Sequence, residues 1–153
     1  EFLNGGIFDY TYSERFNQPV VYRGINMTKL NAIIFLLKDD SDTRKAVLDV
    51  YGHYLDESDD YHLDGNYRIP CSMYYDFLIR ENNKKEKVLH ICYHQRSSDF
   101  ITHFGNDVYL AWLLKDYVAN KVGIKSGYLY HTIDSLHSYK KDWVKLKTSL
   151  SNY

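Results

Sequence analysis

The chain lacks a long hydrophobic run and a strong net charge. These two absences argue against a membrane and against nucleic acid as partners. No hydrophobic run approaches the roughly 20 residues of a membrane-spanning helix, and no signal peptide is present. The formal net charge is only −1, so there is no strongly basic surface to attract nucleic acid. We therefore expect a soluble protein that engages neither a membrane nor nucleic acid.

The chain also has few cysteines and no metal-ligand spacing. Cys71 and Cys92 lie about five residues out of register on a predicted hairpin, roughly 15 Å apart at about 3.3 Å per residue, which is too far for a disulfide. Free thiols are typical of a reducing compartment and predict a cytoplasmic location. His90 and His94 would lie about 13 Å apart on a strand, and the acidic run 56–66 lacks the calcium-loop spacing, so we predict no metal.

What is present indicates one globular domain spanning residues 1–153. The chain is long enough for a substantial core, and 44% of its residues are hydrophobic. Its 16 tyrosines suit a β-rich core and aromatic-lined pockets. The expected class is α/β (α+β), in which helices pack over a mixed, largely antiparallel sheet.

The clearest element is a hairpin. Residues 73–80 and 88–94 are rich in aromatic and β-branched residues, and the stretch between them is wholly polar. If the turn is centred near Lys84, facing residue numbers sum to about 168. Cys71 then lies opposite Ser97 and next to Arg96.

Other segments follow helical or strand periodicity. Asn26 is a plausible N-cap for a helix whose apolar positions run from Met27 to Leu37, and a strand is expected over residues 46–51. A second helix begins at Asn106–Asp107 and ends at Gly123 as C-cap. Its predicted core stripe is Leu110, Leu113, Leu114, Tyr117, Val118 and Lys121. A strand over residues 126–132 and a helix from about Asp134 follow. That last helix would point Leu136, Tyr139, Trp143, Leu146 and Leu150 inward.

Cys71 is the candidate nucleophile. A thiol beside a guanidinium has a lowered pKa and forms thiolate more readily, whereas a cysteine in an apolar wall stays an inert thiol. A free cysteine at the start of a strand is more often a small buried hydrophobic residue, so the neighbours decide between the two readings.

At these residues the chain resembles the thymidylate synthase and pyrimidine-nucleotide hydroxymethylase superfamily. The matching elements are Pro70-Cys71, Gln95-Arg96-Ser97-Ser98-Asp99, Asn106-Asp107 and Ser135-Leu136-His137-Ser138-Tyr139, in that order and spacing. The resemblance covers residues 10–143 and implies the superfamily's fold and a homodimer that pairs through its sheets. Residues 7–16 resemble a Tyr-Gly-x-Arg segment, and an aromatic strand or turn packed on the core is an equal reading.

Asp107 distinguishes the members of this superfamily. Synthases that read uracil carry Asn there, whereas phage-type deoxycytidylate hydroxymethylases carry Asp after Asn, as this chain does. Cytosine offers an acceptor nitrogen and a donor amino group, which a protonated carboxylic acid can meet with one donor and one acceptor. The alternative is that Asp107 only caps the following helix.

The resemblance implies roles for further residues. Arg96 and Ser97, together with Arg44 and Lys45 from the partner subunit, would hold a nucleotide phosphate, and His137 and Tyr139 the sugar. Asp99 belongs to the same implied substrate-binding set. Without the motif, Arg44 and Lys45 would be interpreted as a solvated basic pair at a strand edge. Helical spacing alone would place one of His137 and Tyr139 in the core and the other at its edge. The superfamily's usual N-terminal region, with a catalytic Glu and part of the folate site, precedes the stretch matched here.

The implied activity is hydroxymethylation at carbon 5 of a cytosine nucleotide, dCMP or CMP, with 5,10-methylenetetrahydrofolate and Cys71 as nucleophile. Ser72, where synthases commonly have His, favours this reading. Two alternatives stay open: a thymidylate synthase that methylates dUMP, and a nucleotide-binding homologue or fragment without catalysis.

Overall fold

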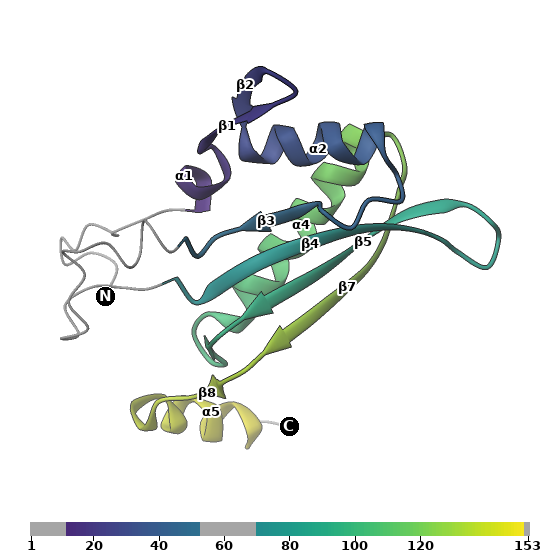
Figure 1. Cartoon of the computed structure of the whole chain (residues 1–153). Coiled ribbons are helices and arrows are strands. Elements are labelled where there is room, and N and C mark those ends of the chain that lie inside the picture. Colours follow the sequence, from purple (N-terminus) through teal and green to yellow (C-terminus); the bar gives the residue numbers. More distant parts are fainter. Residues whose placement is uncertain (1–11, 53–69, 152–153) are drawn as a thin grey trace, which may run out of the picture.

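A four-stranded mixed sheet forms the centre of the computed structural model, which describes residues 12–52 and 70–151 (Figure 1). The strand order is β3-β4-β5-β7. β3 (Val47–Asp49) and β5 (Lys87–Gln95) lie antiparallel to β4 (Ser72–Glu81), and β7 (Lys125–Ile133) runs parallel to β5. The prediction of a mixed, largely antiparallel sheet is confirmed.

Two helices cover one side of this sheet. α2 (Lys29–Asp39) packs over β3, while α4 (Phe104–Val122) packs over β5 and β7 and contacts α2 (Figure 1). The smaller elements are α1 (Tyr12–Phe16), β1 (Pro19–Tyr22), β2 (Ile25–Thr28), β6 (Ser98–Asp99), β8 (Leu136–His137), a 3-10 turn η1 (Lys140–Asp142) and α5 (Trp143–Leu150). No helix of the described part is long and apolar enough to span a membrane.

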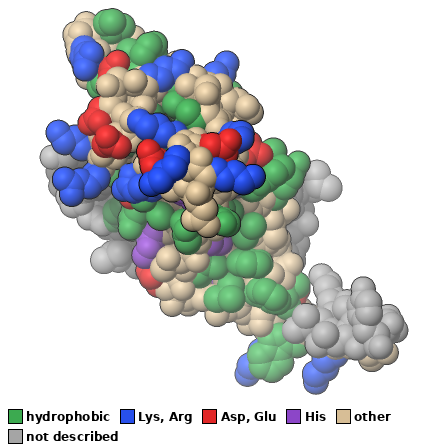
Figure 2. Space-filling view, turned by 90° about the vertical axis from the view of Figure 1, so that its right-hand side faces the viewer, with side chains coloured by type: hydrophobic (Ala, Val, Ile, Leu, Met, Phe, Trp, Pro, Cys, Tyr) green, Lys and Arg blue, Asp and Glu red, His purple; other side chains and the backbone are tan. Residues whose placement is uncertain are grey.

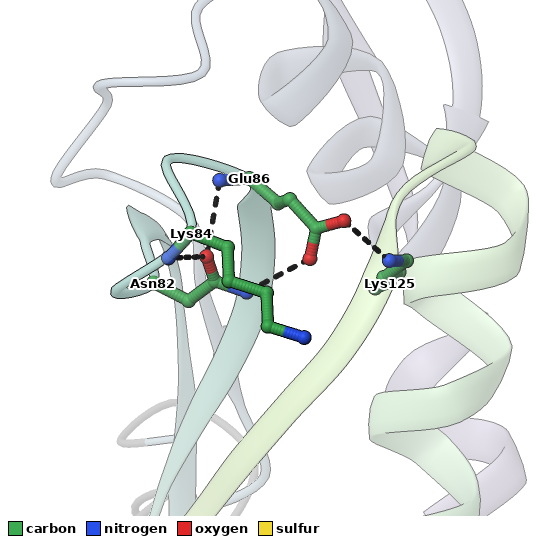
Figure 3. A network of polar contacts seen from close by, with 4 residues as sticks. All are labelled: Asn82, Lys84, Glu86 and Lys125. Atoms are coloured by element: carbon green, nitrogen blue, oxygen red, sulfur yellow. Dashed lines mark hydrogen bonds and ion pairs between the residues drawn. The ribbon is translucent and has the colours of Figure 1, made fainter.

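The β4–β5 hairpin has the predicted register because its turn is held by side chains. Asn82 Oδ1 accepts the backbone N–H groups of Lys84 and Glu86 at 2.8 and 3.0 Å, and Asn82 Nδ2 donates to the Glu86 carboxylate (Figure 3). Lys125 Nζ donates to the same carboxylate at 2.6 Å and links the turn to β7. Pairs from Tyr74 with His94 to Glu81 with Lys87 then follow in sequence.

An irregularity shifts this register at the start of β4. Ser72 pairs with Gln95, one residue out of step with the pairs that follow. The Arg96 N–H donates to the Cys71 carbonyl at 2.9 Å, so Cys71 lies opposite Arg96 and not opposite Ser97 as predicted. Strand propensity does not reveal a bulge, because the extra residue changes the hydrogen-bond pairing of the two strands and not their amino-acid composition.

The first long helix starts later than predicted. Thr28 is its N-cap, with Oγ1 accepting the Asn31 N–H at 3.2 Å, and residues 26 and 27 belong to β2, which pairs with β1. The expected strand over residues 46–51 is shorter, as β3. Part of the segment 7–16 forms α1, whose Tyr12 and Phe16 pack on the core. The residues of that segment before Tyr12, and the acidic run 56–66, lie outside the described residues.

α4 ends as predicted, but its buried face is different. Gly123 is the C-cap, with a φ of 88° in the left-handed region. The helix buries Ala111, Lys115, Val118 and Ala119. Leu110, Leu113 and Tyr117 of the predicted core stripe are exposed, together with Tyr109 and Trp112. Of the predicted stripe, Val118 is buried and Leu114 packs against the core, so the prediction is right for these two residues and wrong for the three exposed ones.

The predicted helix from Asp134 is also wrong. Leu136 and His137 form β8, which pairs parallel with β6, and the helix begins only at Trp143. Leu136, Tyr139 and Trp143, expected inward, are exposed. A partner strand 38 residues away in the sequence overrides the local helical pattern.

The core lies between the sheet and the two helices. Its largest fully buried side chains include Tyr75, Tyr93, Phe77, Leu37 and Leu48. The opposite sheet face carries Tyr74, Tyr128 and Tyr130, all exposed. On the face toward which the β4–β5 turn points, Lys and Arg side chains mingle with Asp and Glu, and hydrophobic side chains gather below them (Figure 2).

Candidate active site

The Cys71 thiol lies at the end of the sheet where β4 begins and β5 ends. Ser97 Oγ donates to Cys71 Sγ at 3.4 Å, and both residues are partly exposed. Arg96 Nε donates to the Pro70 carbonyl at 3.0 Å, which holds the guanidinium beside the Pro70–Cys71 peptide. The predicted grouping of thiol, hydroxyl and guanidinium is therefore present, even though the register differs by one residue.

The other cysteine lies elsewhere on the hairpin. Cys92 pairs with Asp76 on β4, and both cysteines are free thiols, as predicted. Burial and the nearby Asp76 carboxylate raise the pKa of Cys92, which keeps it a protonated thiol. Cys71 is thus the better placed of the two to react with a ligand.

A buried cluster of hydroxyl groups lies behind Cys71. Ser72 Oγ bonds to the hydroxyls of both Tyr12, at 2.7 Å, and Tyr93. The Tyr75 ring stacks on Tyr93 with centroids 4.4 Å apart. Burial raises the pKa of Tyr75 to about 12 and raises those of Tyr12 and Tyr93 further, so all three stay protonated donors. Ser72 on β4 thus links Tyr12 of α1 to Tyr93 of β5.

The Asp107 carboxyl joins this corner from the first turn of α4. Asp107 Oδ2 accepts from Gln95 Nε2 at 2.9 Å and from Ser98 Oγ at 3.3 Å. The helix N-cap is His103, so Asp107 does not cap α4. The capping alternative is wrong, and the side chain is instead turned toward the end of β5.

Asp99, the last residue of the Gln95–Asp99 motif, shapes the turn between β6 and α4. The Asp99 carboxylate accepts the Ile101 N–H at 3.1 Å. Burial raises the pKa of Asp99, but hydrogen bonds from Thr102 and from backbone N–H groups outweigh it, so the net pKa is lowered and the carboxylate stays ionised. Its substrate-binding role stays a prediction; the visible role is to shape this turn.

The β6–β8 pairing brings the sugar-binding candidates to the same corner. His137 pairs with Asp99, and the His137 and Tyr139 rings meet edge to face with centroids 5.3 Å apart. Tyr139 is 54% exposed, so its hydroxyl is accessible to a ligand. The two residues lie on a strand end and a loop, where sequence periodicity had placed a helix.

Arg44 and Lys45 do not join this group. The carbonyl of the next residue, Ala46, accepts the N–H of Phe77, six residues along β4 from Cys71, or roughly 20 Å at a strand rise of about 3.3 Å. Both basic side chains are exposed. They lie too far from the thiol of their own chain to share a ligand of nucleotide size with it.

A cavity of about 250 Å³ is lined by Asp42, Ile79, Arg80, Glu81 and Lys87, at the turn end of the hairpin and far from the thiol. Within the described ranges, no group of three His, Cys, Asp or Glu side chains could hold a metal ion.

Sequence reasoning missed two residues of this corner. Gln95 belongs to the motif that ends at Asp99, and His131 lies in the predicted strand over residues 126–132, but neither is a predicted site residue. Gln95 Oε1 lies 2.7 Å from His131 Nε2, and the imidazole stacks between Tyr93 and Phe104. The available signal was strand alternation: His131 occupies a core-facing position of β7, where a polar side chain needs a partner.

Comparison with known proteins identifies the family of the chain. A family model described as thymidylate synthase matches residues 3–153. A protein of Methanococcoides burtonii named "Putative thymidylate synthase" is 28% identical over 94% of this chain and 59% of its own length. A protein of the same name from Methanosarcina mazei is 29% identical over 89% of this chain and 55% of its own.

A solved structure supports the fold. Thermostable thymidylate synthase A from Bacillus subtilis matches with a TM-score of 0.72 at 17% identity, over 91% of this chain and 46% of that one. The chain thus spans less than two thirds of the length of these relatives. Because the family model covers nearly all of it, the chain belongs to the thymidylate synthase family.

Proposed function

We propose that this chain carries the nucleotide-binding and nucleophilic part of an enzyme that transfers a one-carbon unit to carbon 5 of a cytosine nucleotide, dCMP or CMP, and yields the hydroxymethyl product. One observation carries the choice of cytosine. A carboxyl group, Asp107, stands beside the Cys71 corner, and the resemblance described above implies an amide at this place in members that read uracil. A protonated carboxyl can donate to the ring nitrogen of cytosine, which an ionised carboxylate cannot do.

Cys71 acts as the nucleophile. Its sulfur adds to carbon 6 of the pyrimidine and makes carbon 5 nucleophilic. The Ser97 hydroxyl donates to Sγ at 3.4 Å, and Arg96 Nε donates to the carbonyl of the preceding residue, Pro70. The donor used by the family, 5,10-methylenetetrahydrofolate, would supply the one-carbon unit and be released as tetrahydrofolate. Loss of the carbon 5 proton, addition of water to the transferred carbon and elimination of the Cys71 sulfur from carbon 6 would complete hydroxymethylation.

The remaining candidate residues orient the nucleotide. Arg96 and Ser97 bind the phosphate, and His137 and Tyr139 bind the sugar from the β6–β8 side. Asp99 supports these contacts through the turn that it forms. All of these residues lie on β6, β8 or the adjoining loops, so a single nucleotide could reach them together with Cys71.

A homodimer would complete the phosphate site. Arg44 and Lys45 lie far from Cys71 of their own chain but are exposed, which suits a role at the site of the partner subunit. The sheet face away from the helices carries Tyr74, Tyr128 and Tyr130, each at least 39% exposed, and offers an aromatic surface for pairing. A monomeric mass in light scattering would refute this arrangement.

The main alternative is methylation of dUMP. It is favoured by the names of the relatives, both of which are called thymidylate synthases. A third possibility is that the chain binds nucleotide without turning it over. The three are separated by release of tritium from carbon 5 of labelled dCMP and dUMP, measured with and without methylenetetrahydrofolate.

The tritium assay has a distinct result for each reading. Folate-dependent release from dCMP alone supports the proposal, and release from dUMP alone refutes it. Binding of either nucleotide without release supports the non-catalytic reading. Binding should be measured in parallel by calorimetry, so that loss of turnover is distinguished from loss of affinity.

Matched variants test the two central residues. Cys71→Ser should abolish tritium release, whereas Cys92→Ser, at the hairpin's other free thiol, should retain it; full activity in Cys71→Ser would exclude this covalent route. Asp107→Asn should shift binding from cytosine toward uracil nucleotides. An unchanged preference would remove Asp107 from base recognition.

A further inference from the structure

The sheet face away from the helices carries an acidic and a basic side chain on β4 that the site does not use. Asp76 and Arg80 lie on the same face because an even number of residues separates them on a strand. Their backbones are about 13 Å apart at roughly 3.3 Å per residue. Among the described elements, no helix covers this face (Figure 1). Both side chains can therefore meet another molecule.

The Asp76 carboxylate lacks a hydrogen-bond donor. Its Oδ1 atom is buried and accepts no hydrogen bond from the part of the chain that the structure describes. Its neighbours on the adjoining strands are Val47, which has no side-chain donor, and Cys92, which is a weak one. Burial raises the pKa of Asp76, and the charge of Arg80 offsets this only in part. The side chain is half-buried, so a cation on the open face can reach the carboxylate.

The Arg80 guanidinium is the matching donor. Within the described ranges it donates to the carbonyl of the adjacent Ile79, at 2.6 Å, and forms no ion pair. A guanidinium has five N–H donors in a planar fork that suits a carboxylate, so donors remain after this one bond. The residue is exposed, and a second molecule can therefore reach these donors.

The two residues form a pattern that is complementary to itself. Leu78 lies midway between them, half-buried on the same face. A two-fold axis that passes through this face at Leu78 puts Asp76 opposite the partner's Arg80 and forms the reverse pair at the same time. One contact between two copies then makes two ion pairs. An unrelated partner would need both charges at the same spacing to do so.

The rest of this face is suited to burial but does not fix how two copies are rotated. Tyr74, Tyr128 and Tyr130 are 39%, 70% and 54% exposed, and aromatic side chains are enriched in protein interfaces. Aromatic contacts are tolerant of a change in orientation, whereas charged groups favour the arrangement in which opposite signs meet. The charges on β4 can therefore specify a register that the tyrosines leave open.

We propose that Asp76 and Arg80 set the register of a homodimer, each Asp76 pairing with the partner's Arg80 across the sheet face. This inference rests on the homodimer of the proposed function and adds the two residues that specify it. The carboxylate that lacks a donor in one chain receives one from the other. Any register that brings two Asp76 or two Arg80 side chains together is disfavoured by like charge.

Charge reversal tests the pairing. Arg80→Asp gives each copy two acidic residues and Asp76→Arg gives two basic ones, so each variant alone meets like charge across the interface. In sedimentation equilibrium on the full chain, the dimer dissociation constant should rise about a hundredfold in each variant. A mixture of the two should form a heterodimer of near wild-type affinity, because one chain then supplies both acids and the other both bases. A mixture of folded variants that associates no better than either alone overturns the inference.

A control variant and a folding test complete the design. Lys84→Glu also reverses an exposed charge, but in the hairpin turn beyond the paired strands, and it should keep the wild-type dissociation constant. Circular dichroism melting shows whether each variant folds. If Asp76→Arg does not fold, Arg80→Asp decides against this control. A wild-type dissociation constant in Arg80→Asp, with or without a lower Tm, means that the two charges act only within one chain and overturns the inference.

These association measurements need no nucleotide, so the inference and the proposed catalysis can fail separately. A wild-type dimer whose charge-reversed variants associate normally overturns the inference alone. A monomeric wild-type chain overturns it together with the proposed dimer. If the variants pair as expected but neither dCMP nor dUMP releases tritium, the proposed catalysis fails and the inference stands.

Discussion

Replacing Gly127 by alanine should destabilise the chain because a side chain has no room there. Gly127 lies where the β5–β7 register shifts. There two residues of β7, 127 and 128, lie opposite a single residue of β5, His90. A Cβ at Gly127 would lie 2.9 Å from two atoms of the His90 ring and 3.0 Å from the Leu89 carbonyl. The ring cannot move freely, because its Nδ1 accepts the Tyr128 N–H at 3.0 Å.

The expected magnitude follows from these contacts. Overpacking costs about 1–3 kcal/mol, and loss of the Tyr128 hydrogen bond about 1 kcal/mol more. Reduced freedom of the unfolded chain returns about 0.4–1 kcal/mol. Gly127→Ala should therefore lower the free energy of unfolding by about 2 kcal/mol, or roughly 4–8 °C in Tm for a chain of this size.

A second glycine provides the control. Gly105 lies in the first turn of α4 with no atom within 4 Å of its would-be Cβ, so Gly105→Ala should be neutral or stabilising by up to about 1 kcal/mol. Urea unfolding of both variants gives the comparison. In a His90→Ala background two of the three close contacts disappear, so the cost of Gly127→Ala should shrink. Equal stability of the two alanine variants, or additivity with His90→Ala, would refute the reasoning.

Three further predictions concern stability. Leu37→Ala, at a core position with 1% exposure, should cost about 2–5 kcal/mol in urea unfolding, whereas Phe35→Ala on the exposed face of α2 should cost far less; similar losses would contradict the assigned face. Thr28→Ala should cost about 1 kcal/mol and Thr28→Ser almost nothing, because only the hydroxyl caps α2. Burial, Arg80 and Lys115 lower the pKa of His90 below its usual 6.5, so the unfolded chain takes up a proton first as the pH falls. Stability should decline below about pH 6.5, and less steeply in His90→Asn; identical slopes between pH 5.5 and 7.5 would show that His90 does not contribute.

Local signals predicted the elements whose boundaries are set locally. The polar stretch between two β-rich runs located the β4–β5 turn, and Asn82, which organises that turn, lies within it. Gly123 marked the end of α4 because the C-cap needs a left-handed backbone, which glycine adopts without strain. The bulge beside Cys71 had no such signal, since it depends on how the end of β5 turns toward β6.

Longer-range pairing explains the failures. The segment after Asp134 has helical spacing, yet the Ser98 N–H donates to the Ser135 carbonyl and the Phe100 N–H to the His137 carbonyl, which commits it to β8. In α4, apolar residues occur around most of the helix, so periodicity could not choose a face. The buried face of α4 is the one that carries the small residues Ala111 and Ala119, which allow close packing on the sheet.

Asp107 shows why the candidate site was only partly predictable. The sequence placed an acidic residue at a helix start, where capping is the commonest role, and a family motif suggested base recognition instead. The structure separates these readings through residues remote in sequence: Gln95 and Ser98 donate to the carboxyl, while His103 is the N-cap. A side chain held by two buried donors cannot also turn back to its own helix end. The same donors that remove it from capping leave one oxygen for a ligand, so the local structural role and the proposed functional role exclude each other at this residue.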